Sequence, residues 1–323
     1  MRAMRAESFT GYEGLKLVGV PRPTLADGRV LVRITAAGVS PLDHTILAGG
    51  HPRAKAPLIL GNEGAGIVED PGDSAFAVGA RVMFCGPYGV SEDGTYAEWI
   101  AARAEDLCAI PEAIDDATAG GLPVAYLTAQ ITLTQAGFAP GKTVLAPAIG
   151  GAVGNAATQL ARAQGAAKAI STTTNPLKAK QARALGFDDV IDLSSESLVD
   201  AVARLTGSRG VDIVIESVGG TLTGEALAAV ALNGVVTSLG YSAGRKTTID
   251  VTDLIWKRAS MSGFSLFAQG PAVKAAAWAS IRSLLSSGQV KPIVARTYKL
   301  DAADEALRHL IEDRPFGRVV LLP

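Results

Sequence analysis

The chain has 323 residues, of which 48% are hydrophobic and 19% are charged, and its formal net charge is −1. This length suggests about two domains, and the near-neutral charge gives no broad basic surface for a nucleic-acid partner. The 2 cysteines are too few for a disulfide framework. No signal-peptide core opens the sequence and no apolar run reaches the ~18 residues of a membrane span, so a cytoplasmic protein without a membrane partner is expected.

Short strands are expected before about residue 120. In the segment RVLVRITAAGV, the residues Val30, Val32 and Ile34 lie on one face of an alternating pattern, which is typical of a half-buried strand. Glycine and proline punctuate three further short strands, in GAGIVED, GARVMFC and YAEWIAA. The helical stretch DDATAGGLPVAYLTAQITLTQAG ends this β-rich region.

From Lys142 onward, strands and helices alternate. Gly165 ends the first helix, Asn175 and Pro176 suit the start of the second, and Gly186 ends that one. The alternation predicts an α/β fold with a doubly wound parallel sheet and right-handed crossovers. The five expected strands are KTVLAPA, AKAIST, DDVIDL, VDIVIESVGG and GVVTSLG.

After about Phe264 the pattern is mixed, with helices in VKAAAWASIRSLLSSG and DEALRHLIED and a final strand in GRVVLLP. We expect this tail to return to the first domain and complete it. The predicted limits are therefore residues 1–122 for a catalytic domain, 123–263 for a nucleotide-binding domain and 264–323 for the return.

The turn after the first parallel strand, in VLAPAIGGAVGNAATQL, predicts a dinucleotide site. A helix N-terminus at this place offers unpaired backbone N–H groups and partial positive charge, which favour a pyrophosphate at Gly151 to Val153. Small residues at Ala148, Gly150, Gly151 and Gly154 allow close approach of the backbone. A tight turn without a ligand is the alternative, but the surrounding strands favour the nucleotide.

The end of the second parallel strand indicates which nucleotide. NAD sites place an acidic residue there for the ribose 2′-hydroxyl, yet there is none between Asn155 and Phe187. Hydroxyl and lysine side chains take its place, which favours a 2′-phosphate and therefore NADP(H), near Thr172, Thr173 and Lys178. The alternative is that Lys178 lies on a solvated helix face.

Seven segments, in this order and spacing, resemble the medium-chain dehydrogenase/reductase superfamily, in particular its zinc-independent quinone oxidoreductase branch, which includes zeta-crystallin-like proteins. Ala148 at the first position of the turn is typical of that branch. The resemblance implies a GroES-like β-barrel catalytic domain interrupted by a Rossmann domain, an active site in the cleft between them, and a homodimer. The segments are VLVRITAAGVSPLD, LILGNEGAGIVE, GGLPVAYLTA, APAIGGAVGNAATQLA, DIVIESVGG, SGFSLF and GRVVLLP.

The resemblance also implies cofactor contacts. Thr128 corresponds to a threonine near the nicotinamide ribose, Lys178 to the lysine on the 2′-phosphate, and Arg318 to a common lysine near the cofactor. With the turn residues, the remaining predicted set is Ala148, Gly150, Gly151, Ala152, Val153, Thr172, Thr173, Ser217, Val218, Gly219, Leu239, Gly240, Tyr241, Phe264, Ser265 and Leu266.

No metal site is expected. Ser40 and Asn62 stand where zinc-dependent relatives have a cysteine and a histidine ligand, and a structural zinc needs about four grouped thiolates. Without such a Lewis acid, hydride addition to an electrophilic acceptor is favoured over alcohol oxidation. A quinone or an α,β-unsaturated carbonyl fits, with the protein supplying position and hydrogen bonds.

The resemblance places the catalytic residues at Ser40, Asp43 and Thr45. Ser40 and Thr45 replace a frequent Asn and Tyr and can each donate a hydrogen bond, while Asp43 either acts in the reaction or orders its loop. His44 is a weaker candidate for a proton donor, and solvent can protonate the product instead. Two alternatives stay open: an enoyl-thioester reductase, and a non-catalytic NADPH-binding protein with a crystallin-like or RNA-binding role.

Overall fold

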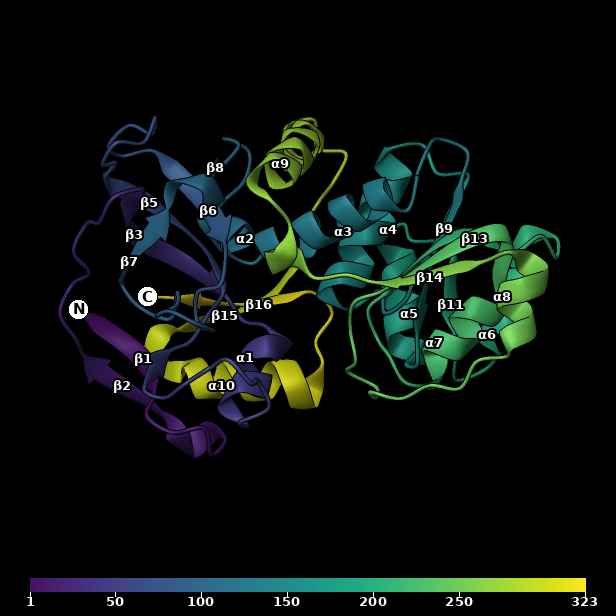
Figure 1. Ribbon diagram of the computed structural model, residues 1–323, viewed down its shortest axis with the longest axis horizontal. Helices are drawn as coiled ribbons and strands as arrows, with labels where there is room; N and C mark the ends of the chain where they lie inside the picture. The colour runs from purple at the N-terminus through teal and green to yellow at the C-terminus, as the bar shows by residue number, and fades with distance from the viewer. The chain divides into compact units, whose positions relative to one another are not determined.

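The computed structural model describes residues Met1–Pro323, which form two compact units. The first unit contains Met1–Val124 and Pro292–Pro323, and the second contains Ala125–Lys291 (Figure 1). The second unit therefore extends beyond the expected limit at residue 263. The reason is that helix α9 (Pro271–Ser286) packs on helix α4 (Ala152–Ala163), so the chain returns to the first unit only at Pro292.

Buried side chains hold the chain where it passes from one unit to the other. In the first unit, the Val124 N–H donates to Glu63 Oε2 at 2.7 Å. In the second, Gln159 binds the main chain of Lys291 twice: its Oε1 accepts from the Lys291 N–H at 2.7 Å, and its Nε2 donates to the carbonyl at 3.0 Å. Each of these contacts lies within one unit.

The first unit contains two β-sheets, as a GroES-like domain requires. A three-stranded antiparallel sheet has the order β2 (Leu15–Gly19), β1 (Arg2–Ala6), β4 (Leu58–Ile59). A seven-stranded sheet has the order β15 (Val294–Lys299), β16 (Arg318–Leu322), β3 (Arg29–Gly38), β5 (Glu63–Asp70), β6 (Arg81–Cys85), β8 (Leu107–Ala109), with β7 (Trp99–Arg103) also paired to β3. Because β16 pairs with β3, the last strand of the chain joins the sheet formed by the strands from Arg29 to Ala109.

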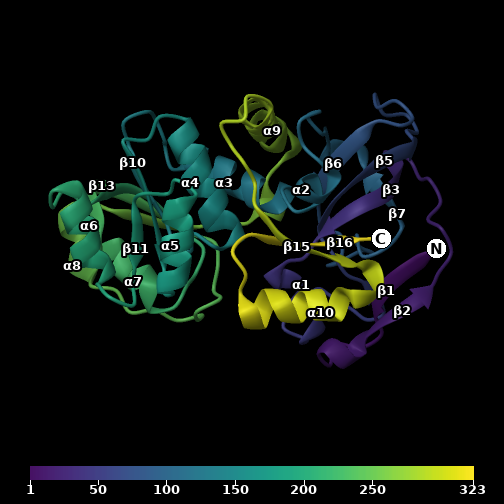
Figure 2. The same cartoon turned by 180° about the vertical axis from the view of Figure 1, so that it is seen from behind.

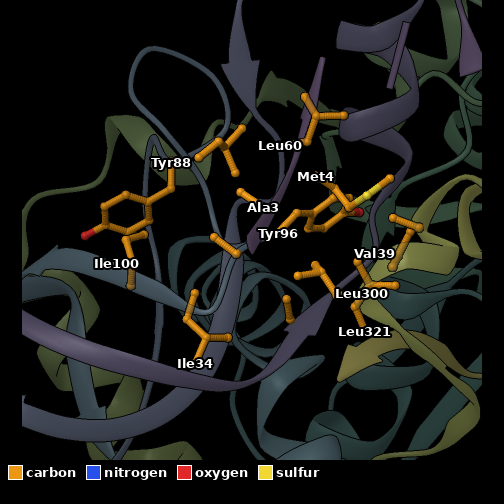
Figure 3. Packing of buried hydrophobic residues seen from close by; sticks show 14 of the residues in the cluster. Ala3, Met4, Ile34, Val39, Leu60, Tyr88, Tyr96, Ile100, Leu300 and Leu321 are labelled. Carbon is orange, nitrogen blue, oxygen red and sulfur yellow. The ribbon is translucent and has the colours of Figure 1, made fainter. Parts of the chain in front are cut away.

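The core of the first unit follows the alternation of β3. Val30, Val32 and Ile34 are buried as expected. Figure 3 shows how Ile34 belongs to one apolar cluster with residues from the N-terminal strand, the middle strands and the C-terminal tail, among them Ala3, Met4, Val39, Leu60, Tyr88, Tyr96, Ile100, Leu300 and Leu321. The tail residues confirm that residues 292–323 share this core.

The second unit is built on the expected parallel sheet, which has six strands. Their order is β11 (Val190–Asp192), β10 (Lys168–Thr173), β9 (Thr143–Ala146), β12 (Val211–Glu216), β13 (Val230–Ser238), β14 (Ser260–Gly263), and every pair is parallel. The doubly wound fold is confirmed. The sixth strand, β14, was not predicted because its sequence SMSG has no run of apolar residues.

The helices of the second unit begin and end close to their predicted signals. Asn175 caps α5 by accepting from the Leu177 and Lys178 N–H groups, and Gly207 ends α6 in the left-handed region. β13 begins at Val230 beside Val211, earlier than the predicted strand GVVTSLG, so α7 already ends at Ala228. The helices are α5 (Pro176–Ala184), α6 (Leu198–Thr206), α7 (Thr221–Ala228) and α8 (Val251–Lys257).

The helical stretch predicted after Asp115 is two helices, α2 (Asp116–Gly120) and α3 (Pro123–Gln135), because Pro123 has no N–H and begins a new helix. In the first unit, α1 (Pro41–Leu47) packs beside α10 (Ala303–Arg308), as Figure 2 shows. The chain contains no helix with the length and apolar character needed to span a membrane.

Candidate active site and cofactor-binding site

Thr172, on the neighbouring strand β10, accepts two hydrogen bonds from the turn between β9 and α4. The Ala148 N–H donates to the Thr172 hydroxyl at 3.2 Å, and the Ile149 N–H donates to its carbonyl at 2.8 Å. Ala148 adopts a positive φ of 67°, which turns the chain sharply out of the strand. Thr172 is only 2% exposed, so its side chain supports the turn and does not lie on the solvent-facing surface of the turn.

The first turn of α4 leaves its backbone donors available. The N-cap is Gly151, whose missing side chain provides no capping oxygen, and no acidic residue lies in the first turn. The N–H groups of Ala152 and Val153 therefore have no acceptor within the helix. A side chain on Gly154 would lie 2.1 Å from the Pro147 carbonyl oxygen, so only glycine lets the helix approach its strand this closely. This cradle fits a pyrophosphate.

The end of β10 carries hydroxyl and amide side chains. The Thr173 hydroxyl accepts from the Asn175 N–H at 3.2 Å, and the half-buried Lys178 follows in the first turn of α5. A carboxylate that the acid-free stretch does not reveal lies beside this strand end: Asp192 on β11 is the register partner of Thr173. Its Oδ1 accepts from the Ser194 N–H and hydroxyl, which lower the pKa of this carboxyl.

A buried carboxylate shapes the turn after β12. Glu216 is 0% exposed, and its Oε1 accepts from the N–H groups of Val218 and Gly219 at 2.7 and 2.8 Å. Its Oε2 accepts from the Thr223 hydroxyl at 2.8 Å. Glu216 was absent from the predicted set, although an acid that ends an apolar strand just before a Gly-Gly pair is a signal for such a role.

The structure brings together three of the predicted cofactor segments at the ends of β12, β13 and β14. A side chain on Gly240 would lie 2.0 Å from the Ser217 carbonyl oxygen, so the turns after β12 and β13 touch through main chain. The Phe264 N–H donates to the Ser238 carbonyl at 3.0 Å, which places the third segment beside them. Tyr241 is 50% exposed, and the Arg245 guanidinium lies 5.4 Å from its ring centroid.

Thr128 lies on α3 and is 5% exposed, and its carbonyl accepts from the Thr132 hydroxyl at 2.7 Å. It therefore belongs to the same unit as the nucleotide loops. Its predicted contact with a nicotinamide ribose stays a prediction.

In the first unit, Asp43 organises the start of α1. It is 1% exposed, and its Oδ2 accepts from the Ser40 N–H at 2.8 Å, the Ser40 hydroxyl at 2.9 Å and the Tyr96 hydroxyl at 3.0 Å. Its Oδ1 accepts from the Gly61 N–H at 3.1 Å. Burial raises the pKa of this carboxyl, and the hydrogen bonds oppose the shift. The geometry favours the loop-ordering role for Asp43.

The two hydroxyls predicted to donate to the acceptor are both used inside the protein. Ser40 donates to Asp43, and the Thr45 hydroxyl donates to the Pro41 carbonyl at 3.1 Å. Each hydroxyl has one proton, so in this geometry both present only lone pairs. The half-buried His44 packs against Tyr12, with ring centroids 5.7 Å apart.

Arg318, predicted to lie near the cofactor, is buried in an ion pair within the first unit. Its guanidinium pairs with Glu63, and its Nε donates to the Gly121 carbonyl at 2.7 Å. Glu63 is 0% exposed and Arg318 is 8% exposed. The pair neutralises the buried carboxylate and fixes the end of α2, which is a structural role that needs no cofactor.

Two family models match the chain: the alcohol dehydrogenase GroES-like domain over residues 26–112 and the zinc-binding dehydrogenase domain over residues 152–282. Quinone oxidoreductase from Rattus norvegicus is 31% identical over 100% of this chain and 98% of its own length. The chain belongs to the medium-chain dehydrogenase/reductase superfamily. Members of this superfamily are oxidoreductases that use a nicotinamide cofactor.

Two further members of the superfamily resemble this chain. The 2-haloacrylate reductase of a Burkholderia species is 32% identical over 95% of this chain and 93% of its own length. A mycobacterial protein solved as a complex with NADPH is 30% identical, covers 100% of both chains and superposes with a TM-score of 0.88.

The side chains of this superfamily member do not form a metal site. It has no group of three or more His, Cys, Asp or Glu side chains that are placed to hold a metal ion. Ser40 and Asn62, which the resemblance aligns with zinc ligands, offer neither thiolate nor imidazole. The donor set therefore does not fit zinc.

Proposed function

We propose that this protein is an NADPH-dependent oxidoreductase that transfers a hydride to a quinone or to an α,β-unsaturated carbonyl compound, without zinc. The observation that carries the proposal is the uncapped first turn of α4 beside a strand end that offers hydroxyls and Lys178. Rat quinone oxidoreductase and Burkholderia 2-haloacrylate reductase, both similar along nearly the whole chain, support the class of acceptor.

The second unit supplies the cofactor contacts in this proposal. The main-chain N–H groups of Ala152 and Val153 bind the pyrophosphate, since the Gly151 N–H already donates to the Ala148 carbonyl at 2.9 Å. Lys178 neutralises the ribose 2′-phosphate. Glu216 holds the turn after β12 in the shape that the dinucleotide requires. The bound dihydronicotinamide supplies a hydride, and the chain's own task is to orient the reactants and exclude water.

The first unit supplies the acceptor-binding residues in this proposal. The loop around Ser40 and Thr45 lines the acceptor, while Asp43 keeps that loop in place. Because no side chain here is set up as a general acid, solvent provides the proton that completes the reduction. An oxygen of the acceptor gains negative charge when the hydride adds, and hydrogen-bond donors stabilise that charge.

We also propose that the protein works as a homodimer joined at β14. This strand is the edge of the six-stranded sheet, with one side of its backbone unpaired. Beside it in sequence, α8 exposes three large apolar side chains: Val251 (59%), Ile255 (64%) and Trp256 (76%). Sedimentation should show a dimer, and Trp256→Glu should shift it towards monomer; a monomeric wild-type protein at micromolar concentration contradicts the proposal.

One assay series tests the activity. NADPH oxidation is followed at 340 nm with 1,4-benzoquinone, phenanthrenequinone, an enal and a crotonyl thioester. Turnover with a quinone or the enal supports the proposal. Turnover with the thioester alone makes the protein an enoyl-thioester reductase, and tight NADPH binding without any turnover makes it a binding protein.

Two lysine variants test the choice of cofactor. Lys178→Ala should raise KM for NADPH by roughly tenfold or more and leave KM for NADH almost unchanged, because only NADPH carries the 2′-phosphate. Lys180→Ala, on the exposed side of the same helix, is the matched control and should leave both unchanged. Equal effects of Lys178→Ala on both cofactors contradict the assignment, and Asp192→Asn then tests whether that carboxylate binds NADH.

A further inference from the structure

Asn62 has a buried amide oxygen without a hydrogen-bond partner. The residue is 2% exposed, and only Asn62 Oδ1 and Thr35 Oγ1 are buried side-chain oxygens or nitrogens that lack a partner. Such an atom lowers the stability of the folded protein, because it gives up hydrogen bonds to water and receives none in return. A side chain of similar size without polar atoms would avoid this cost.

The backbone around Asn62 is held on both sides, which fixes where the side chain leaves the main chain. The Gly86 N–H donates to the Asn62 carbonyl at 3.1 Å, and the preceding Gly61 N–H donates to Asp43. Gly61 has a φ of +95°, and a side chain there would lie 2.3 Å from the Thr95 hydroxyl oxygen. The protein therefore presents the unpaired amide in a fixed place.

Asn62 also lies next to the proposed acceptor site. One carboxylate, Asp43, binds both Ser40 and Gly61, the residue before Asn62. Ser40 and Thr45 already donate their protons inside the protein. Of the polar side chains at these positions, the Asn62 amide is the one whose hydrogen-bonding capacity is not used up.

We propose that the Asn62 amide binds the carbonyl oxygen of the acceptor; this inference rests on the proposed function. The amide nitrogen of Asn62 donates no hydrogen bond within the protein, and unlike Oδ1 it is not one of the fully enclosed atoms. Its N–H group therefore lies on the accessible side of the residue and is available to a carbonyl oxygen. Asn62 is then a catalytic residue of the hydride transfer.

The role of the amide in the step is electrostatic. The hydride brings two electrons and one proton to a ring or β-carbon of the acceptor, and the displaced π electrons move to the carbonyl oxygen. That oxygen becomes an enolate oxygen, and the Asn62 N–H donates a hydrogen bond to it without losing its proton. With a quinone, the ring becomes the hydroquinone when one proton leaves the reduced carbon and another is gained by the second carbonyl oxygen. Water then supplies the second proton, so the atoms and charges balance.

Opposite effects on stability and on turnover test the inference. Asn62→Leu keeps the number and branching of the side-chain heavy atoms and has no polar atom, so it should raise the thermal midpoint by about 2 °C or more and lower kcat/KM for the quinone or enal by roughly 100-fold. The loss should fall mainly on kcat, and the Kd for NADPH should not change. Asn62→Ala serves as a second variant if leucine does not pack.

Thr35→Val is the matched control, because it removes the other unpaired buried oxygen at almost constant volume. It should raise the thermal midpoint and leave kcat/KM unchanged. If Asn62→Leu behaves like Thr35→Val in both measurements, the inference is overturned while the proposed function stands. If the wild-type protein reduces no quinone or enal, the proposed function itself fails, and the inference fails with it.

Discussion

The two units build their functional geometry from different parts of the chain. In the second unit, main-chain atoms form the cofactor-binding surface. The first turn of α4 has Gly151 as its N-cap, which has no side chain, and the turns after β12 and β13 contact each other at a glycine. In the first unit the geometry depends on side chains, since Asp43 holds the loop of Ser40 and Glu63 pairs with Arg318.

The difference affects how each region responds to substitution. A main-chain site tolerates many side-chain changes, provided that the glycines and the strand order remain. A side-chain site depends on each partner, because a buried polar group that loses its partner becomes a cost. The first unit should therefore be the more sensitive of the two to conservative substitutions.

The largest expected effect is that of Arg318→Met, which leaves Glu63 as an unpaired buried carboxylate. We expect a loss of about 3–5 kcal/mol in the free energy of unfolding in urea. Arg33→Met is the control, because Arg33 pairs with Glu69 on the surface, where the side chains are 44% and 34% exposed. Its cost should stay below about 1 kcal/mol. Equal losses in the free energy of unfolding for the two variants would show that the buried ion pair contributes no more to stability than the surface pair.

A matched pair of carboxylate-to-amide changes compares the units directly. In Asp43→Asn the new NH₂ group must face a backbone N–H, either of Ser40 or of Gly61, so we expect a loss of about 2–3 kcal/mol. In Glu216→Gln the NH₂ group faces only the Thr223 hydroxyl, which accepts after rotating, so the loss should be about 1 kcal/mol. Urea unfolding measures the free-energy loss of each variant. A larger loss for Glu216→Gln than for Asp43→Asn would contradict the expectation that the first unit is the more sensitive to substitution.

The two units also differ in how a helix begins: a side chain caps α2 in the first unit, whereas no side chain caps α4 in the second. Asp115 caps α2 in the first unit by accepting from the Thr118 N–H at 2.8 Å, and this bond lowers the pKa of the carboxyl. Because the pKa is lower in the folded state, the stabilisation is present above the unfolded pKa and is lost as the pH falls through the folded one. Asp115→Ala should cost about 1 kcal/mol at pH 7.

The cost of Asp115→Ala should shrink as the pH falls below about 4, the ordinary pKa of an aspartate. Asp115→Asn is the control: it keeps a capping oxygen, so its stability at pH 7 should stay near that of the wild type. Thermal midpoints across the acid range measure the effect. A cost that does not vary with pH contradicts the cap as its source.

The smallest expected effect is a gain. Ala148 adopts a φ of 67°, a conformation that costs an L-residue about 1 kcal/mol and glycine much less. Part of that gain is offset by the greater freedom of glycine in the unfolded chain, so Ala148→Gly should add about 0.5 kcal/mol. Ala163→Gly, in the last residue of α4, should instead cost about 1 kcal/mol. A loss in Ala148→Gly would show that the alanine methyl group packs usefully in the turn.

The same contrast explains what could be predicted from the sequence. The parallel sheet and the turn of Ala148 to Gly154 were predictable, because local periodicity and glycine spacing determine them. The partners of Asp43 were not, since Gly61 and Tyr96 lie far along the chain. Nor was the Glu63–Arg318 pair, whose members are separated by 255 residues.

Short strands at sheet edges also escaped prediction. β14 and β15 carry mostly exposed residues, so they lack the apolar pattern that marks a strand. The placement of Asp192 beside Thr173 depends on the register of two strands, which an acid-free stretch of sequence does not reveal. Ser40 and Thr45 were predicted as donors from their positions in the family resemblance and from their residue type, whereas the direction of a hydroxyl proton depends on its neighbours.

The contacts at the two chain crossings have a consequence for protein engineering. Glu63 holds Val124 from within the first unit, and Gln159 holds Lys291 from within the second. A chimera that replaces residues 125–291 with the equivalent segment of a relative keeps the first contact in the host, and the second contact then depends on the guest's own equivalent of Gln159. The second unit is therefore a segment suited to exchange between relatives, because a side chain already binds the main chain at each of its two boundaries.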